Sequence, residues 1–201
     1  EAVTGTKQMN GTAILRFLAR KHNMYGDNEE QATQIDVVLG GWEGSQSLDH
    51  NAFTFLVLLC NTKSPLADLR AKFAALVYDP NFAAKREQYE QQTLPPWLSF
   101  FETLLRNNLN AHGSSASFVG MHLNFADLYA WDVLSSHMGL APDCLHQFPL
   151  LSSFFFGTAA RPNISRYLQS ERRPRYATGA TAFFGNEANP PDHANNPFQR
   201  Q

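Results

Sequence analysis

Apolar residues recur at helical spacing along most of this chain, and this periodicity constrains the fold more than any other feature. Residues 12–22 and 28–42 each space their apolar side chains for one face of a helix. Later segments repeat the pattern: 66–77, 97–105, 145–156 and 161–168. Since the chain offers no credible pair of strands between these helices, we expect an all-α bundle.

Three stretches interrupt the helical pattern. Residues 44–67 begin as a loop and contain the β-prone apolar run 52–60. The step from Thr93 to Pro96 interrupts a helix-prone stretch, because proline lacks the N–H group that a helix interior needs. Residues 107–117 are polar, and we expect a loop there.

The sharpest local signal is the sequence Asn124-Phe-Ala-Asp127, which precedes an apolar run. The Asn124 side chain can accept a hydrogen bond from the backbone N–H of Asp127, and the Asp127 carboxylate can accept one from the N–H of Asn124. We therefore expect a capping box that starts a core helix. Its loss should cost on the order of 1 kcal/mol or more.

Length, charge and cysteine content limit which kinds of protein and which partners are compatible with this sequence. At 201 residues the chain can form one good-sized core. Its net charge of -2 gives no basic field for phosphate backbones or anionic lipids, so we expect neither nucleic acid nor membrane as a partner. Cys60 and Cys144 have no metal-type spacing, so we expect free, buried thiols and a reducing compartment.

No motif indicates a metal site or a hydrolase. His112, His122, His137 and His146 lie on separate expected elements, and no His-Glu-x-x-His spacing occurs. The sequence also lacks a Gly-x-Ser-x-Gly elbow and a phosphate-binding glycine-rich loop. We expect no bound metal.

Taken in order, several segments resemble the helical C-terminal domain of cytosolic glutathione transferases, the mu class most. The matched segments are 10–26, 73–82, 118–132, 142–149 and 161–170. A single such match is weak evidence for the family. Their order along the chain is what makes the resemblance specific.

The resemblance implies three parts. Residues 1–26 are then a remnant of the thioredoxin-like, glutathione-binding domain, 27–175 the helical C-terminal domain, and 176–201 a tail. We expect 44–67 to be an insertion, because its removal restores one continuous helix. It is either a real bulge or a product of imperfect splicing or gene prediction.

In this family a tyrosine hydroxyl lowers the pKa of the glutathione thiol, and the thiolate then attacks an electrophile. The resemblance places that tyrosine before Glu1, so we expect no thiol-activating residue within the printed sequence. Asn10 and Gly11 match the residue pair that binds the γ-glutamyl end of glutathione, and a shift of the pair toward Gln8 is the alternative. Asn10 has a structural reading as well, as a plain N-cap.

The resemblance also assigns residues outside the opening helix. Asp68 matches an aspartate that approaches the glutathione of the neighbouring subunit, with Asp49 as a rival, and a solvated carboxylate is the alternative for Asp68. Tyr78 matches a tyrosine that faces the electrophile and can stabilise developing negative charge, although a partly buried anchor is its alternative. Phe184 from the tail is a further candidate for the electrophile site.

Two functions remain open at this point. The first is a glutathione transferase that conjugates glutathione to small apolar electrophiles, with glutathione as co-substrate, no cofactor, a homodimeric complete protein and a cytoplasmic location. This chain would supply the wall of the electrophile site and the dimer surface, and we expect no turnover from it alone. The second is a non-catalytic helical module that docks on a larger assembly.

Overall fold

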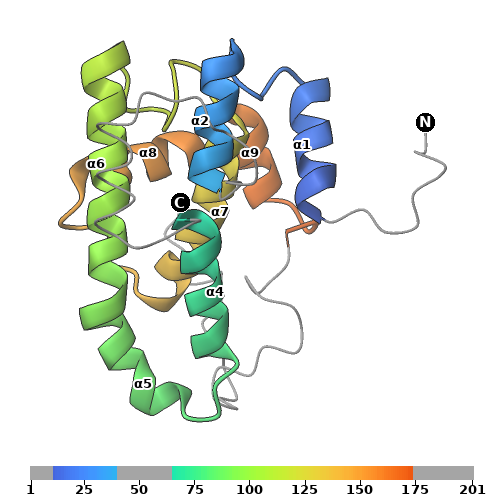
Figure 1. Ribbon diagram of the computed structural model, residues 1–201. Helices are drawn as coiled ribbons and strands as arrows, with labels where there is room; N and C mark the ends of the chain where they lie inside the picture. The colour runs from blue at the N-terminus through green and yellow to red at the C-terminus, as the bar shows by residue number, and fades with distance from the viewer. Residues whose placement is uncertain (1–10, 40–64, 174–201) are drawn as a thin grey trace.

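A computed structural model describes residues 11–39 and 65–173 of the chain, and the structural statements below concern these residues. Every regular element in these two ranges is a helix, which confirms the expected all-α bundle (Figure 1). The elements in chain order are α1 (Gly11–Lys21), α2 (Glu29–Leu39), α4 (Pro65–Val77), α5 (Phe82–Gln88), η1 (Tyr89–Thr93), α6 (Leu94–His112), α7 (Phe125–Leu140), α8 (Pro149–Ala159) and α9 (Pro162–Leu168).

The expected interruption at Thr93 to Pro96 is wrong, because α5, the π-helical turn η1 and α6 follow one another without a loop. In the wider π turn the N–H of Leu94 donates to the carbonyl of Tyr89, five residues earlier. Pro95 and Pro96 then fall in the first turn of α6. Proline is tolerated there, since the first N–H groups of a helix have no acceptor within it.

The expected loop over 107–117 is wrong in its first half, because α6 continues to His112 and ends at Gly113 with a left-handed φ of 71°. Asn108 explains the error, since its polar side chain serves the loop while its backbone remains helical. The Asn108 amide donates to the carbonyls of Ser114, Ser117 and Gly120 and accepts from the N–H of Gly120.

The helix α7 lies at the centre of the bundle. It contacts α1, α2, α4 and α8, and most of its residues are buried. Trp131 makes two contacts that fix the position of α7 against α8: its ring stacks on Phe155 with centroids 5.4 Å apart, and its indole N–H donates to the Phe155 carbonyl. Because it is surrounded, α7 shows little of the one-sided apolar pattern that surface helices show.

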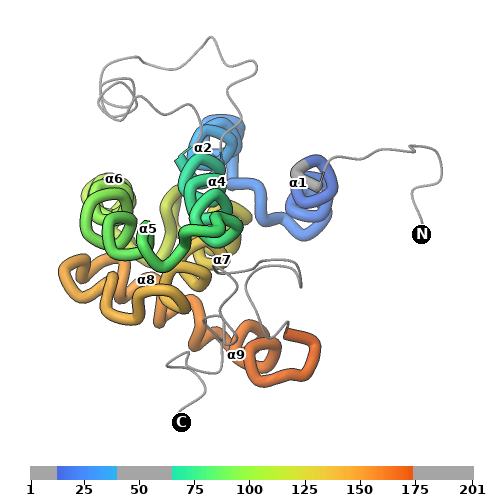
Figure 2. Tube along the Cα trace, turned by 90° about the horizontal axis from the view of Figure 1, so that it is seen from below, coloured from blue at the N-terminus to red at the C-terminus, as the bar shows by residue number. Residues whose placement is uncertain are grey.

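The helices α2 and α4 lie end to end along nearly the same line (Figures 1 and 2). They also contact each other directly. The sequence predicted that one helix was interrupted here, and this arrangement is consistent with that prediction. Residues 40–64 lie outside the described ranges, whereas 65–67, the last part of the predicted insertion, form the first turn of α4, with Leu66 buried.

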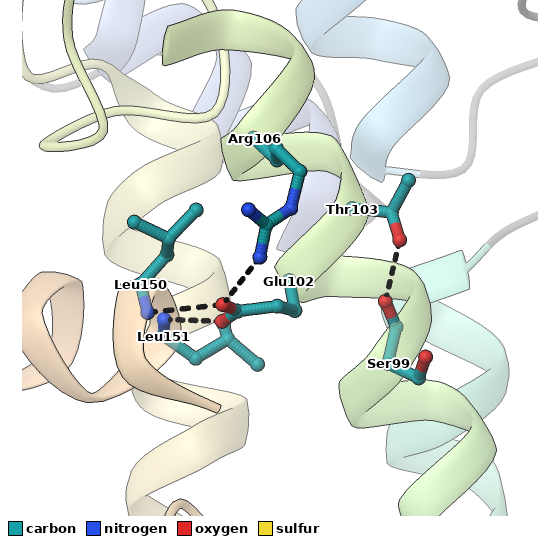
Figure 3. A network of polar contacts seen from close by, with 6 residues as sticks. All are labelled: Ser99, Glu102, Thr103, Arg106, Leu150 and Leu151. Carbon is teal, nitrogen blue, oxygen red and sulfur yellow. Dashed lines mark hydrogen bonds and ion pairs between the residues drawn. The ribbon is translucent and has the colours of Figure 1, made fainter. Parts of the chain in front are cut away.

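A carboxylate of α6 holds the start of α8 (Figure 3). Glu102 is 7% exposed, and its two oxygens accept hydrogen bonds from the N–H groups of Leu150 at 3.1 Å and Leu151 at 2.8 Å. Arg106 lies one turn further along α6 and pairs with the same carboxylate at 3.4 Å. A negative charge at a helix N-terminus satisfies N–H groups that have no partner within the helix and interacts favourably with the helix dipole.

Candidate functional site

The start of α7 confirms the predicted capping box. The Asn124 side-chain oxygen accepts from the N–H groups of Ala126 and Asp127, and an Asp127 oxygen accepts from the N–H of Asn124 at 2.8 Å. Asp127 is 0% exposed and also accepts from the Ser117 hydroxyl and the Phe118 N–H. The box is therefore part of a larger buried network that also fixes the loop before α7.

The charge state of this buried carboxylate reflects two opposed effects. Burial raises the pKa of Asp127 to about 7, because the ionised form loses its hydration. The donors from Phe118, Asn124 and Ser117 act in the opposite direction by stabilising the ionised form. These contacts bind the chain to itself, so the structure supports the predicted structural role for Asn124 and Asp127.

A second buried polar pair joins the π turn to α7. The Tyr89 hydroxyl lies 3.0 Å from Nε2 of His137, whose Nδ1 lies 2.7 Å from the Val133 carbonyl. Burial lowers the pKa of His137 to about 4, so the ring is neutral near pH 7. In the neutral ring Nδ1 must donate to the carbonyl, which leaves Nε2 to accept from the tyrosine. Both ring nitrogens are thus satisfied within the protein.

The helix α1 differs from the rest because its large apolar side chains point away from the bundle. Ile14, Leu15, Phe17 and Leu18 are each between 41% and 45% exposed. Among residues 13–21, Ala19 is the one that is buried. The helix stands to the side of the bundle in both views (Figures 1 and 2).

Polar contacts hold this helix in place. Nε of Arg16 lies 2.9 Å from Oδ1 of Asp36 on α2, and the Tyr25 hydroxyl donates to the same oxygen at 2.5 Å. The Arg20 guanidinium lies over the Tyr25 ring, 4.5 Å from its centroid. We call Arg16, Arg20, Tyr25 and Asp36 the α1 clamp.

The structure describes part of the predicted glutathione-binding remnant. Gly11 is the first residue of α1, whereas Asn10 and its alternative Gln8 lie outside the described residues. Asp68 lies in the first turn of α4 and is half-buried, and its rival Asp49 is not described. Because α1 and α2 run in opposite directions, the start of α1 lies level with the junction of α2 and α4 in Figure 1. Gly11 and Asp68 thus lie on separate helices, each near the start of its own helix.

The predicted electrophile-site residues are separated from this remnant along α4. Tyr78 directly follows α4, is 46% exposed, and donates its N–H to the Ala74 carbonyl. Ten residues of helix correspond to about 15 Å, so Tyr78 lies at the end of α4 opposite Asp68. Phe184 lies outside the described residues. The assignments of Asp68, Tyr78 and Phe184 therefore stay predictions.

An open groove of about 560 Å³ lies between the end of α1 and the start of α2. Its lining includes Arg20, Asn23, Gly26, Asp27 and Glu29, and none of the predicted site residues that the structure describes. Its cationic and anionic groups face the same space. The groove is therefore separate from the predicted site.

Within the described ranges no cluster of histidine, cysteine, aspartate or glutamate could hold a metal ion. Cys144 is a free thiol, as predicted. Burial raises its pKa to about 12, so it is protonated and unreactive near neutral pH. Cys60 lies outside the described residues.

Sequence reasoning missed three residues that connect separate segments: Asp36 and Glu102 each join two helices, and Asn108 joins α6 to the loop that follows it. Each occupies a helical position where a solvent-facing polar residue is the ordinary interpretation. The strongest available signal was Arg16, a long cation in the middle of an otherwise apolar part of α1. Its partner on α2 could not be read from sequence spacing.

Comparison with known proteins decides the family. Residues 67–171 match the family described as "Glutathione S-transferase, C-terminal domain". The chain belongs to the glutathione S-transferase family. The matched range starts in α4 and runs past α9, so it covers the central part of the bundle described above.

Individual glutathione S-transferases agree with this assignment. Glutathione S-transferase P 1 of Bufo bufo is 35% identical over 170 residues, covering 83% of this chain and 67% of that protein. The P enzyme of Homo sapiens is 34% identical over 157 residues, covering 78% and 61%. A solved Pi-class structure from Onchocerca volvulus has a TM-score of 0.60 at 28% identity, covering 80% of this chain and 64% of its own.

These relatives refine the expectation in two ways. They carry the P or Pi-class name, so the predicted likeness to the mu class receives no support, whereas the family itself is confirmed. The chain spans about 61% to 67% of the length of these relatives.

In the part of the chain that the structure describes, no helix is both long and apolar enough to cross a membrane.

Proposed function

We propose that this chain is the electrophile-binding and subunit-contacting part of a pi-like glutathione transferase. The reaction is attack of the glutathione thiolate on a small apolar electrophile, in a cytoplasmic homodimer. The observation that carries the proposal is the family match over residues 67–171, together with relatives named glutathione S-transferase that cover most of the chain.

The position of Tyr78 supports this function. Its hydroxyl belongs to a half-exposed side chain directly after α4, a helix with one buried face, so the backbone at Tyr78 is anchored while the hydroxyl reaches solvent. A phenol O–H in such a place can donate a hydrogen bond to charge that develops on an electrophile in the transition state. The chain would need a separate group to activate the thiol, since the resemblance places that tyrosine before Glu1.

The first test compares two tyrosines with the same exposure. Tyr78 and Tyr167 are each 46% exposed, but Tyr167 lies on α9. In the complete gene product, including any codons upstream of Glu1 (the upstream-extended product), Tyr78→Phe should lower kcat for an aryl electrophile by roughly tenfold, because one transition-state hydrogen bond is lost. Tyr167→Phe should leave kcat unchanged. Equal kcat values in both variants would refute the role of Tyr78.

The exposed apolar face of α1 favours a second candidate, a non-catalytic module that docks on a larger assembly. The two functions predict different behaviour of the gene product on immobilised glutathione. Retention with measurable conjugation by the upstream-extended product supports the transferase. A start codon directly before Glu1, with neither retention nor conjugation, supports the module.

A further inference from the structure

The helix α1 has little apolar contact with the bundle, so something else must determine where it sits. Among residues 13–21 only Ala19 is buried. The helix ends in a Schellman motif: the N–H of Met24 donates to the Ala19 carbonyl, the N–H of Asn23 donates to the Arg20 carbonyl, and Asn23 has a left-handed φ of 53°. This motif directs the chain onward but does not set the rotation of α1 about its axis.

The α1 clamp sets that rotation. Arg16 and Arg20 are four residues apart and therefore share one face of the helix. Arg16 is held by the Asp36 carboxylate, and Arg20 by the face of the Tyr25 ring. Tyr25 is 8% exposed and belongs to the apolar core, so this anchor is rigid.

Asp36 is the residue on which these contacts converge. A single carboxylate oxygen accepts from both Arg16 and Tyr25. Burial and the neighbouring carboxylate raise the pKa of Tyr25, so its hydroxyl keeps the proton that it donates. The link continues to the central helix, because the Met24 carbonyl accepts from the N–H of Phe125, the first residue of α7.

The rotation of α1 matters because Gly11, its first residue, belongs to the predicted γ-glutamyl site. We propose that Asp36 is a positioning residue that fixes α1 against the bundle and thereby orients the Gly11 N–H toward the γ-glutamyl group of glutathione. The inference rests on the proposed function for its ligand, whereas the clamp itself rests on the contacts between Asp36, Arg16 and Tyr25. Asp36 acts through α1 and does not touch the ligand in this scheme.

The test uses the chain of 201 residues, labelled with nitrogen-15, and one matched control. Asp36→Asn removes the charge that holds Arg16. Asp132→Asn removes the partner of Arg70, an exposed pair between α4 and α7 in which no residue of α1 takes part. Asp36→Glu keeps the carboxylate and serves as the conservative variant. Hydrogen exchange of the α1 amides and the shift of the Gly11 amide on addition of glutathione are measured in each protein.

Asp36→Asn is expected to speed exchange of the α1 amides about tenfold and to weaken glutathione binding several-fold, while exchange in α7 stays constant. Asp132→Asn should change neither quantity, and Asp36→Glu should restore part of both. Cysteinylglycine, which lacks the γ-glutamyl group, should not shift the Gly11 amide.

Each contrary result removes a defined part of the proposal. Unchanged α1 exchange in Asp36→Asn would overturn the positioning role. Faster exchange with unchanged glutathione affinity would overturn the connection between the clamp and the ligand. If glutathione does not shift the Gly11 amide of the wild-type chain, the glutathione site at α1 is refuted, and the exchange data still decide whether Asp36 holds the helix.

Discussion

The start of α7 and the helix α1 are both fixed by polar side chains, but they use them in opposite ways. At α7 the polar network around Asp127 is buried, and the helix that it starts has apolar neighbours on most sides. At α1 the Arg16 side chain reaches Asp36 on α2, whereas the large apolar side chains are exposed. The comparison shows that amphipathicity predicts a helix but does not say what its apolar face covers.

The largest expected effect tests whether the α7 network is essential to the bundle. Asp127→Ala should lower the free energy of unfolding by about 3 kcal/mol or more, because the donors of Ser117, Phe118 and Asn124 lose their buried acceptor. Urea denaturation measures the change. The control is Asp132→Ala on the same helix, whose exposed pair with Arg70 should contribute less than about 0.5 kcal/mol. Equal losses in the two variants would contradict the special role of the cap.

The next prediction concerns how the stability contribution of the buried His137 on α7 depends on pH. The pKa of His137 is about 4 in the folded chain against a reference value of 6.5. The unfolded chain therefore binds more protons in this interval. The stabilising contribution of the neutral ring is complete above pH 6.5 and is lost as pH falls toward 4, amounting to about 3 kcal/mol.

Asp127 titrates in the same interval with the opposite sign, because its folded pKa is raised to about 7. The His137 contribution must therefore be isolated as the difference between wild type and His137→Gln. The stability advantage of the wild type over this variant should shrink between pH 6.5 and 4. An advantage that stays constant with pH would show that His137 has an ordinary pKa.

A smaller effect is expected where a carboxylate joins two helices at the edge of the bundle. Glu102→Ala should destabilise the chain by about 2 kcal/mol, since the N–H groups of Leu150 and Leu151 lose their acceptor at the start of α8. Thr103→Ala is the control, because its hydroxyl donates only to the carbonyl of Ser99 within α6 (Figure 3). Thermal unfolding at one protein concentration compares them, and equal melting temperatures would contradict the assignment.

The smallest expected effect on stability concerns the exposed apolar face of α1. Phe17 is 45% exposed, so Phe17→Ser should change the free energy of unfolding by less than about 0.5 kcal/mol. By contrast, Phe154 lies in the core and is 2% exposed, so Phe154→Ala should lower the free energy of unfolding by about 4 kcal/mol. A large loss in Phe17→Ser would mean that the chain covers the apolar face of α1 itself.

Local sequence signals predicted the helices and the α7 cap well, because each depends on residues close together in the chain. The expected helix 66–77 corresponds to α4 within one residue, and the contacts of Asn124 and Asp127 follow from their spacing of three. The predictions failed at Thr93 to Pro96 and at Asn108. At Thr93 to Pro96 a π-helical turn lets the helix continue through the prolines. At Asn108 the side chain bonds to a later loop while the backbone stays helical.

The candidate site was less predictable for a related reason. The resemblance could propose Gly11, Asp68 and Tyr78 one at a time, but it could not place them in space. The convergence of Arg16 and Tyr25 on one oxygen of Asp36 was invisible in the sequence, since the contact between α1 and α2 depends on how the two helices cross the bundle.

By itself, the sequence determined that the described part of this chain is helical, where α1, α2, α4, α7 and α9 begin to within one residue, and that its segments belong to the glutathione transferase family. Helix periodicity, capping and family motifs depend on residues close together in the chain, so they can be recognised without knowing the fold. Only the tertiary structure decided that α7 is enclosed, that Glu102 and Asn108 connect separate segments, and that α1 turns its apolar face outward. These features arise from contacts between residues distant in sequence, and such contacts exist only once the helices have packed.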